Sequence, residues 1–207
     1  MRDRIVFVVD DDAAVRSALT FLLTAAGHAV ESVASASAFL ETYDPNHQGC
    51  VILDVRMPGM TGLELQQELN ARGWRIPTIF ITGHGTVPIA VAALRAGAFE
   101  FLEKPLRDDA LLDSVGRALA RGETLRRHAA KRMELEARAR LLTPRERDVM
   151  RLVVEGDDNK SIARRLGISY RTVEIHRARV MEKMQARSLS ELVRMVIVLE
   201  GGIEERL

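Results

Sequence analysis

Six polar side chains follow four separate apolar stretches in the first half of the sequence. They are Asp10–Asp12, Asp54, Thr82 and Lys104. Proteins typically hold Mg²⁺ with one or two carboxylates, waters and phosphate oxygens. A carboxylate can also attack phosphorus to form an aspartyl-phosphate. Phosphoryl transfer then needs mainly positioning and neutralisation of the phosphoryl oxygens, which a lysine and a hydroxyl can supply. This set of residue types therefore predicts phosphoryl-transfer chemistry if the chain brings the side chains together.

Alternating strands and helices are expected to position these groups. Five short apolar runs rich in β-branched or aromatic residues predict strands: 5–9, 29–33, 50–53, 76–81 and 99–102. Helical patterns lie between and after them, near 14–26, 36–42, 62–71, 87–96 and 107–120. Five strand–helix repeats favour an α/β doubly wound, parallel five-stranded sheet with helices on both faces. Right-handed crossovers place the carboxyl ends of the strands on one edge, where ligands bind.

With these motifs residues 4–120 resemble a bacterial response-regulator receiver domain, which has a flavodoxin-like fold. The carrying segments are Val8–Asp12, Leu53–Gly62, Ile81–His84 and Glu103–Pro105. The resemblance implies that Asp54 accepts a phosphoryl group from a sensor histidine kinase. It also implies a bound Mg²⁺ (or Mn²⁺), with Asp11, Asp54 and the backbone carbonyl of Arg56 as direct ligands and Asp10 acting through water.

The same resemblance implies a switch around the phosphoryl group. Thr82 and Lys104 would contact the phosphoryl oxygens, and the rotamer of Phe101 would be coupled to Thr82, although plain core packing is an alternative for Phe101. The family also tends to have a cis peptide bond before the residue matching Pro105. Phosphorylation would shift an inactive–active equilibrium and pair two copies through the fourth helix (Val91, Leu94) and the fifth strand.

An alternative reading is an enzyme, a Mg²⁺-dependent aspartyl-phosphate phosphatase or phosphotransferase with a basic tail. Phosphatases resembling the haloacid dehalogenases usually have a second aspartate two positions after the nucleophile, and this sequence has Arg56 there. We therefore expect no enzyme in the usual sense, only phosphoryl transfer to the receiver itself followed by slow autodephosphorylation.

The second half of the chain predicts helices alone. Residues 121–140 are expected to form an exposed helical spacer that continues the preceding helix, and the domain boundaries predicted are 1–120, 121–140 and 141–207. Thr143–Glu146 and Ser188–Glu191 match the capping-box pattern at helix starts. Further helices are predicted at about 144–155, 159–166 and 170–186, with a turn at Gly167–Ser169 between the last two.

That order of helices is typical of a helix-turn-helix. Val173, Val180 and Met184 share one face of the longer helix and are predicted to face the core, with His176 partly buried beside them. Residues 141–199 resemble LuxR-type helix-turn-helix domains, and with the receiver the arrangement is similar to FixJ-type and NarL-type regulators. The nine predicted contacts to double-stranded DNA are Lys160, Arg171, Thr172, Glu174, Ile175, Arg177, Ala178, Arg179 and Lys183.

Charge and composition agree with two domains that have different partners. Residues 1–106 carry eight basic and twelve acidic side chains, whereas residues 159–194 carry nine basic and three acidic ones. A basic stretch favours nucleic acid over a merely solvated face when it coincides with a helix-turn-helix pattern. A homodimer on phosphorylation and RNA polymerase are further expected partners.

The remaining composition limits the cellular setting. The single cysteine, Cys50, excludes an intrachain disulfide and fits a reducing cytoplasm, and it is predicted to lie in the core. No apolar run approaches the roughly 18 residues that a membrane span needs, so no membrane partner is expected.

Overall fold

The computed structural model describes residues 4–45, 47–83 and 86–201. The chain divides into two compact units, Met1–Arg126 and Arg127–Leu207, and each is described by itself. Among the helices in the described ranges, none is long and apolar enough to cross a membrane.

The first unit contains the predicted sheet. Its strands are β1 (Ile5–Val9), β2 (Ala29–Val33), β3 (Gly49–Asp54), β4 (Thr78–Thr82) and β5 (Glu100–Glu103). All neighbouring strands pair in parallel, in the order β2-β1-β3-β4-β5. β4 and β5 begin one or two residues later than predicted and extend one residue further. The doubly wound α/β fold is confirmed.

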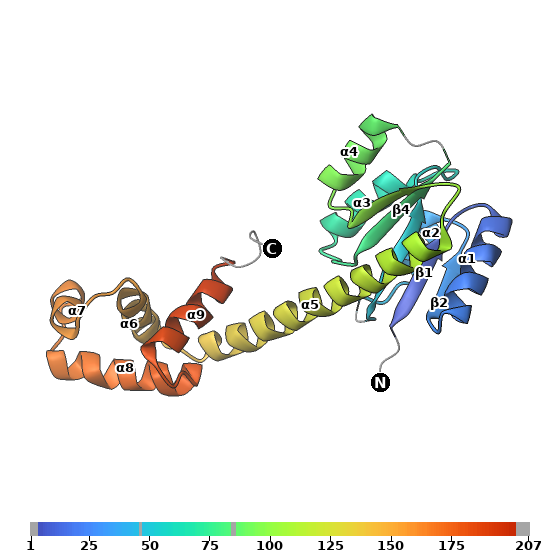
Figure 1. Cartoon of the computed structure of the whole chain (residues 1–207). Coiled ribbons are helices and arrows are strands. Elements are labelled where there is room, and N and C mark those ends of the chain that lie inside the picture. Colours follow the sequence, from blue (N-terminus) through green and yellow to red (C-terminus); the bar gives the residue numbers. More distant parts are fainter. Residues whose placement is uncertain (1–3, 46, 84–85, 202–207) are drawn as a thin grey trace. The chain divides into compact units, whose positions relative to one another are not determined.

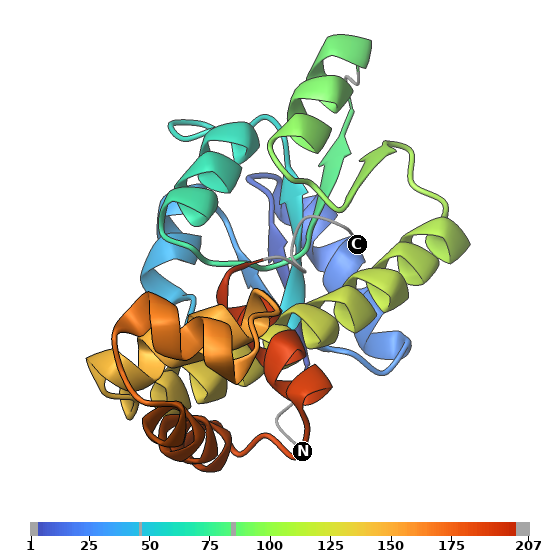
Figure 2. The ribbon, with the colours of Figure 1, turned by 90° about the vertical axis from the view of Figure 1, so that its left-hand side faces the viewer.

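Five helices cover the two faces of this sheet (Figures 1 and 2). They are α1 (Ala13–Ala25), α2 (Ala36–Thr42), α3 (Gly62–Ala71), α4 (Val87–Arg95) and α5 (Asp108–Arg140). Apolar side chains of α1 and α5 pack on one face, and those of α2, α3 and α4 pack on the other. Side-chain caps fix where three of these helices begin. Asp12 accepts from the first turn of α1, Ser35 accepts from the amide of Ala38 in α2, and Thr61 forms a capping box with Glu64 of α3.

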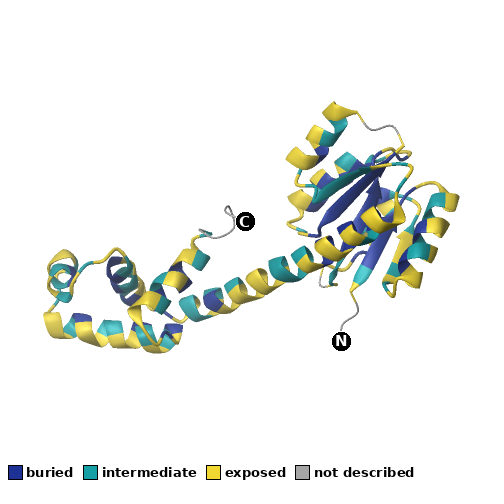
Figure 3. Ribbon diagram, in the orientation of Figure 1, coloured by how far each residue is buried: buried dark blue, intermediate teal, exposed yellow. Residues whose placement is uncertain are grey.

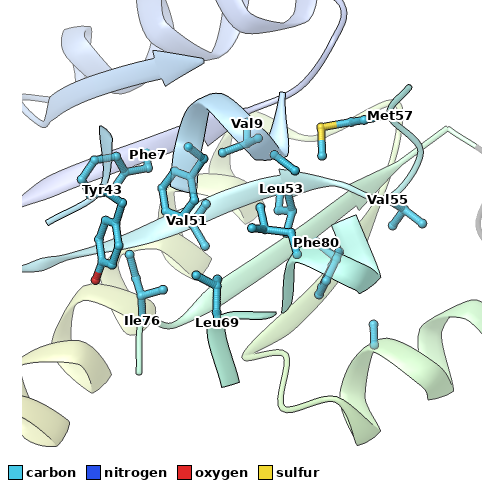
Figure 4. Close-up of a cluster of buried hydrophobic side chains, with 14 residues drawn as sticks. Phe7, Val9, Tyr43, Val51, Leu53, Val55, Met57, Leu69, Ile76 and Phe80 are labelled. Carbon is cyan, nitrogen blue, oxygen red and sulfur yellow. The ribbon is translucent and has the colours of Figure 1, made fainter. Parts of the chain in front are cut away.

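The central strands are buried on both faces, which explains why their sequences show little polar alternation (Figure 3). On the face covered by α2 and α3, Phe7 packs edge-on against Phe39 and Tyr43 with ring centroids 5.5 and 5.4 Å away (Figure 4). Cys50 lies in the opposite cluster, as predicted for a core cysteine. Its burial raises the pKa of the thiol to about 12, so the thiol is protonated and unreactive.

The second unit consists of helices joined by short turns, with no strand among its described residues. Its helices are the end of α5 together with α6 (Pro144–Val154), α7 (Asn159–Leu166), α8 (Tyr170–Met184) and α9 (Leu189–Leu199). The predicted capping box of Thr143 and Glu146 is present. At the start of α9 only half of the predicted box forms: Ser188 accepts from the amide of Glu191, but the Glu191 carboxylate accepts from the amide of Arg187 instead.

The end of α5 differs from the exposed spacer that the sequence predicted. α5 does continue as one helix to Arg140, but Leu135 is only 1% exposed and packs in the core of the second unit. Arg138 also donates from Nη1 to the carbonyl of Met184 at 3.1 Å. The charged composition around Leu135 concealed this contact. The last turns of α5 are therefore part of the second unit's own core.

Candidate functional site

The strand register brings Asp10 and Asp54 side by side at the carboxyl edge of the sheet. Each follows one member of the register pair Val9 and Leu53, on the adjacent strands β1 and β3. Asp10 is 1% exposed and Asp54 is 6% exposed. Two carboxylates at neighbouring buried positions repel each other, so this edge needs a cation to be stable.

Lys104 supplies that cation from the residue directly after β5, at the same carboxyl edge of the sheet. Its Nζ donates to Asp10 Oδ2 and to Asp54 Oδ1, both at 2.9 Å. Partial burial of the ammonium lowers its pKa, but the hydrogen bonds and charges of the two carboxylates outweigh burial and raise the pKa of Lys104 above its ordinary value. The lysine is therefore a permanent cation shared by two carboxylates.

Backbone amides orient the other oxygen of each carboxylate. The amide of Arg56 donates to Asp54 Oδ2 at 2.6 Å, and the amide of Asp12 donates to Asp10 Oδ1 at 2.9 Å. Gly62 lets the start of α3 approach this loop, because a Cβ there would lie 2.2 Å from the Asp54 carbonyl oxygen. Each carboxylate is thus held in one orientation by a lysine and an amide.

Arg16 is a neighbour of the site that sequence reasoning missed. Its Nη1 donates to the carbonyl oxygens of Asp10 and Asp11 at 2.7 and 2.9 Å, so it braces the turn that carries the acidic side chains. The only sequence signal was its place six residues after Asp10, one helical turn into α1.

Asp11 differs from its two acidic neighbours. Its carboxylate makes no hydrogen bond with the described residues, whereas those of Asp10 and Asp12 accept from backbone amides, and it is exposed, as Asp12 is. Thr82 ends β4 and is 1% exposed, while Phe101 on β5 is half-buried against the cluster that contains Phe80. The peptide bond before Pro105 is cis, as the family resemblance implied.

The donor set at this edge fits Mg²⁺ chemically. Among the described side chains no group of three or more His, Cys, Asp or Glu residues could hold a metal ion by itself. Mg²⁺ does not need such a group, because it usually keeps several waters and takes one or two carboxylates. Asp11 offers a carboxylate that makes no hydrogen bond with the described residues, and Asp54 offers a second one at the end of β3.

A second candidate site lies on α7 and α8. Gly167 ends α7 in the left-handed conformation with φ 65°, and Ser169 caps the start of α8. Val173, Val180 and Met184 are buried, as predicted. The predicted DNA-contacting residues that are exposed are Lys160, Arg171, Glu174, Ile175, Ala178 and Arg179. The opposite face of α8 therefore presents a mixed basic and apolar surface.

The other three predicted DNA contacts are partly buried. Thr172 shares a hydroxyl–hydroxyl hydrogen bond of 2.8 Å with Ser169, and Arg177 donates to Asn159 Oδ1 at 2.9 Å. Lys183 donates to Glu146 Oε2 at 2.6 Å, and that carboxylate is 1% exposed. The lysine therefore neutralises a buried carboxylate of its own unit, a role that its sequence position did not indicate.

His176 is partly buried, as predicted. Its Nδ1 is buried and has no hydrogen-bond partner among the described residues. It lies one residue from Ile175, which is 43% exposed. The histidine ring thus marks the border between the core face and the exposed face of α8.

Comparison with protein families agrees with this division. Residues 6–116 match the response regulator receiver domain, and residues 140–196 match the luxR family of bacterial regulatory proteins. The first match contains Asp10, Asp54 and Lys104, and the second contains α6, α7 and α8.

Relatives match both parts together. The transcriptional regulatory protein FixJ of Azorhizobium caulinodans is 51% identical over 93% of this chain and 92% of that protein. The response regulator TodT of Pseudomonas putida F1 is 42% identical over 99% of this chain and 91% of that protein. The solved structure of response regulator StyR is 46% identical, covers 94% of this chain and 98% of that chain, and has a TM-score of 0.79. The crystal structure of full-length FixJ from B. japonicum is 44% identical in sequence and covers 97% of this chain and 99% of that chain, with a TM-score of 0.59. The chain therefore belongs to the response regulators that join a receiver domain to a LuxR-family DNA-binding domain.

Proposed function

We propose that this response regulator controls transcription in the cytoplasm when a sensor histidine kinase phosphorylates Asp54. A carboxylate oxygen of Asp54 attacks phosphorus, the bond from phosphorus to the donor breaks, and the donor leaves with that bonding pair. The observation that supports this best is the pair of 2.9 Å hydrogen bonds from Lys104 to Asp10 and Asp54. The ammonium lies where negative charge would grow on the phosphoryl oxygens.

Mg²⁺ or Mn²⁺ would be held by Asp11, Asp54 and the carbonyl of Arg56, with Asp10 acting through water. A divalent cation at this edge supplies charge neutralisation for the phosphoryl group. Lys104 is shared by the two carboxylates of Asp10 and Asp54, so one lysine meets two negative charges, and Asp11 adds a third carboxylate that makes no hydrogen bond with the described residues. Arg16 keeps the loop in position by its bonds to two carbonyl oxygens, so the carboxylates remain directed at the cation.

Thr82, Lys104 and Phe101 would then respond to the phosphoryl group on Asp54. Thr82 and Lys104 contact the phosphoryl oxygens, and Phe101 follows the movement of Thr82 two strand positions away across the β4–β5 pair. Receiver pairing would use α4, whose Val87, Val91 and Leu94 are 78%, 40% and 55% exposed. Burial of these side chains in a second copy supplies the free energy for dimerisation.

Pairing of two receivers would bring together two DNA-binding domains, so that two copies of α8 could bind the same DNA. Glu174, Ile175 and Ala178 would face base edges in the major groove, with Lys160, Arg171, Thr172, Arg177 and Arg179 near phosphates. Lys183 is left out because it pairs with Glu146. Leu189 and Ile197 of α9 are 46% and 38% exposed, so they are candidates for pairing the two DNA-binding domains. Bound at a promoter, the dimer would act on RNA polymerase.

Two gel-shift series on promoter DNA test this proposal. The chain treated with beryllofluoride or acetyl phosphate should bind DNA at least tenfold more tightly than the untreated chain, about the size of a typical coupling free energy. Asp54→Asn should lose this response and keep the basal affinity. A response that survives in Asp54→Asn would place the switch elsewhere. The enzyme alternative predicts steady-state turnover of small phosphoesters, whereas this proposal predicts one phosphoryl group for each chain.

A further inference from the structure

Glu174 brings a negative charge into the part of α8 that is proposed to face DNA bases. Residues 159–194 carry nine basic side chains and only three acidic ones, which are Glu174, Glu182 and Glu191. Glu174 lies on the exposed face of the helix, whereas its neighbour Val173 is buried in the core. It also lies in the amino-terminal half of α8, and in a helix-turn-helix this half of the recognition helix contacts base edges. A carboxylate therefore enters the major groove if α8 binds DNA as proposed.

The Glu174 carboxylate makes no hydrogen bond with the described residues. Its Oε2 lies 3.8 Å from Nη1 of Arg171, one helical turn earlier, a distance that allows an ion pair but is too long for a hydrogen bond. The Arg171 side chain is 84% exposed, so water surrounds this pair. The buried carboxylate of Glu146, by contrast, accepts from both Lys183 and Thr143. Glu174 thus keeps its acceptor oxygens available for a donor on a bound molecule.

Few base edges offer a suitable donor to a carboxylate. An ionised carboxylate only accepts hydrogen bonds. Guanine and thymine present acceptors in the major groove, and adenine presents its N7 acceptor beside its 6-amino group. Cytosine presents its 4-amino group as a donor, and this is the group that Glu and Asp recognise in the groove. DNA phosphates also repel the carboxylate, so a base pair without a suitable donor at this place leaves the charge uncompensated.

Neighbouring side chains favour this bond. Ile175 and Ala178 are the other two residues proposed to face bases, and both are exposed and offer only apolar contacts. They do not compete for the donor, and they exclude water from the groove around the carboxylate, which strengthens a hydrogen bond. From the position, the unused acceptor and the charge, we propose that Glu174 selects a cytosine in each half-site by accepting a hydrogen bond from its 4-amino group. This inference rests on the proposed DNA binding and adds the base that is selected.

Selection from random duplexes tests the base preference directly. The full-length chain, activated with beryllofluoride, should enrich sites with a cytosine in each half-site that depends on Glu174. In Glu174→Gln the preferred base at that place should change from cytosine to adenine, because a glutamine amide pairs with both N6 and N7 of adenine. In direct binding to single-base variants of the selected duplex, each chain should prefer its own base about tenfold.

Glu182→Gln is the matched control. Glu182 is also exposed on α8, about two turns beyond Glu174 and about 12 Å further along the helix axis. Removing either charge lowers the repulsion from phosphates, so both variants should bind all duplexes more tightly by a similar factor. Only Glu174→Gln should change the preferred base, because the preference depends on a contact rather than on net charge.

A modified base removes the donor without changing the protein. N4-methylcytosine keeps its pair with guanine, and its methyl group replaces the amino hydrogen that points into the major groove. The unchanged chain should bind a duplex with this base about tenfold more weakly, whereas Glu174→Ala should lose at most about twofold.

The proposal is overturned if Glu174→Gln selects the same base as the unchanged chain, if Glu182→Gln changes the preference equally, or if N4-methylcytosine weakens binding by the unchanged chain and by Glu174→Ala to the same extent. In each of these cases the proposed regulation stands, because the selected DNA is still bound. A chain that enriches no sequence after activation would instead contradict the proposed function, together with this inference.

Discussion

Two lysine–carboxylate clusters, one in each unit, differ in how fully their charges are matched. In the receiver, Lys104 is divided between Asp10 and Asp54. In the DNA-binding unit, Lys183 serves Glu146 alone, and the amide of Thr143 donates to the same carboxylate oxygen at 2.8 Å. The receiver cluster keeps excess negative charge at an open edge, whereas the second cluster is neutral. The unmatched charge in the receiver suits a site that binds a cation and reacts. The matched pair of Lys183 and Glu146 is a structural ion pair, which we call the clamp.

The largest expected effect comes from removing the shared lysine. Lys104→Met should slow phosphorylation by acetyl phosphate about 100-fold, the usual cost of losing one group that stabilises developing charge. The rate is measured by intact-protein mass spectrometry over time. Lys183→Met is the matched control and should be phosphorylated at the normal rate. Equal slowing in both variants would mean that the two clusters do not differ as described.

Truncating a core side chain of the second unit should lower the free energy of unfolding the most. Leu135→Ala should destabilise the DNA-binding unit by about 3 kcal/mol, because Leu135 is 1% exposed in its core. Met133→Ala, at a position 70% exposed on the same helix, should change stability little. Urea unfolding followed by circular dichroism checks both variants. If Leu135→Ala and Met133→Ala were equally stable, Leu135 would not belong to the core, and the end of α5 would be the exposed spacer that the sequence predicted.

Breaking the clamp should cost less than deleting core volume. Lys183→Met leaves Glu146 buried without its cation, and we expect a loss of about 2 kcal/mol because the lysine is partly exposed and Thr143 still donates to the carboxylate. Denaturant unfolding measures this difference. Phosphorylation of Asp54 should be unaffected, which separates a structural lysine from a reactive one. An unchanged stability would mean that the buried carboxylate does not need the lysine.

Acid should weaken the clamp in a defined direction. Hydrogen bonds from Lys183 and Thr143 lower the pKa of Glu146 from 4.5 to about 2. Because the folded pKa is the lower one, this stabilisation is complete above pH 4.5 and is lost as the pH falls towards 2. Helical stability by circular dichroism should fall over this interval more steeply in the unchanged chain than in Glu146→Gln. Parallel curves would contradict the assignment.

The smallest effect concerns the excess charge of the receiver cluster. Mg²⁺ at roughly ten times its dissociation constant should stabilise the receiver by about 1.4 kcal/mol. Unfolding followed by Trp74 fluorescence measures this, because the single tryptophan lies in the first unit. Asp11→Asn should lose most of the stabilisation and be no less stable than the unchanged chain without Mg²⁺. Equal stabilisation of both chains would remove Asp11 from the metal site.

Sequence reasoning succeeded where local chemistry decides the structure. The β-branched runs, the cap at Thr143 and the buried face of Val173, Val180 and Met184 all depend on near neighbours in the chain. The right-handed crossover rule predicted that the carboxyl ends of the strands share one edge of the sheet, where Asp10 and Asp54 lie, but it did not predict the strand order β2-β1-β3-β4-β5.

Contacts between distant side chains could not be predicted in the same way. The pairing of Lys183 with Glu146 spans 37 residues, and the bond from Arg138 to the carbonyl of Met184 spans 46. In the sequence Lys183 belongs to a basic helix and Leu135 to a charged one, so both were interpreted as surface residues.

Intact-protein mass spectrometry after treatment with acetyl phosphate and Mg²⁺ tests the central claim most directly. The proposed function predicts one acid-labile phosphoryl adduct for each chain, located on Asp54 by peptide mapping and missing from Asp54→Asn. A chain that remains unmodified, or an adduct that persists in Asp54→Asn, would contradict the claim that the carboxylate held by Lys104 is the phosphoacceptor.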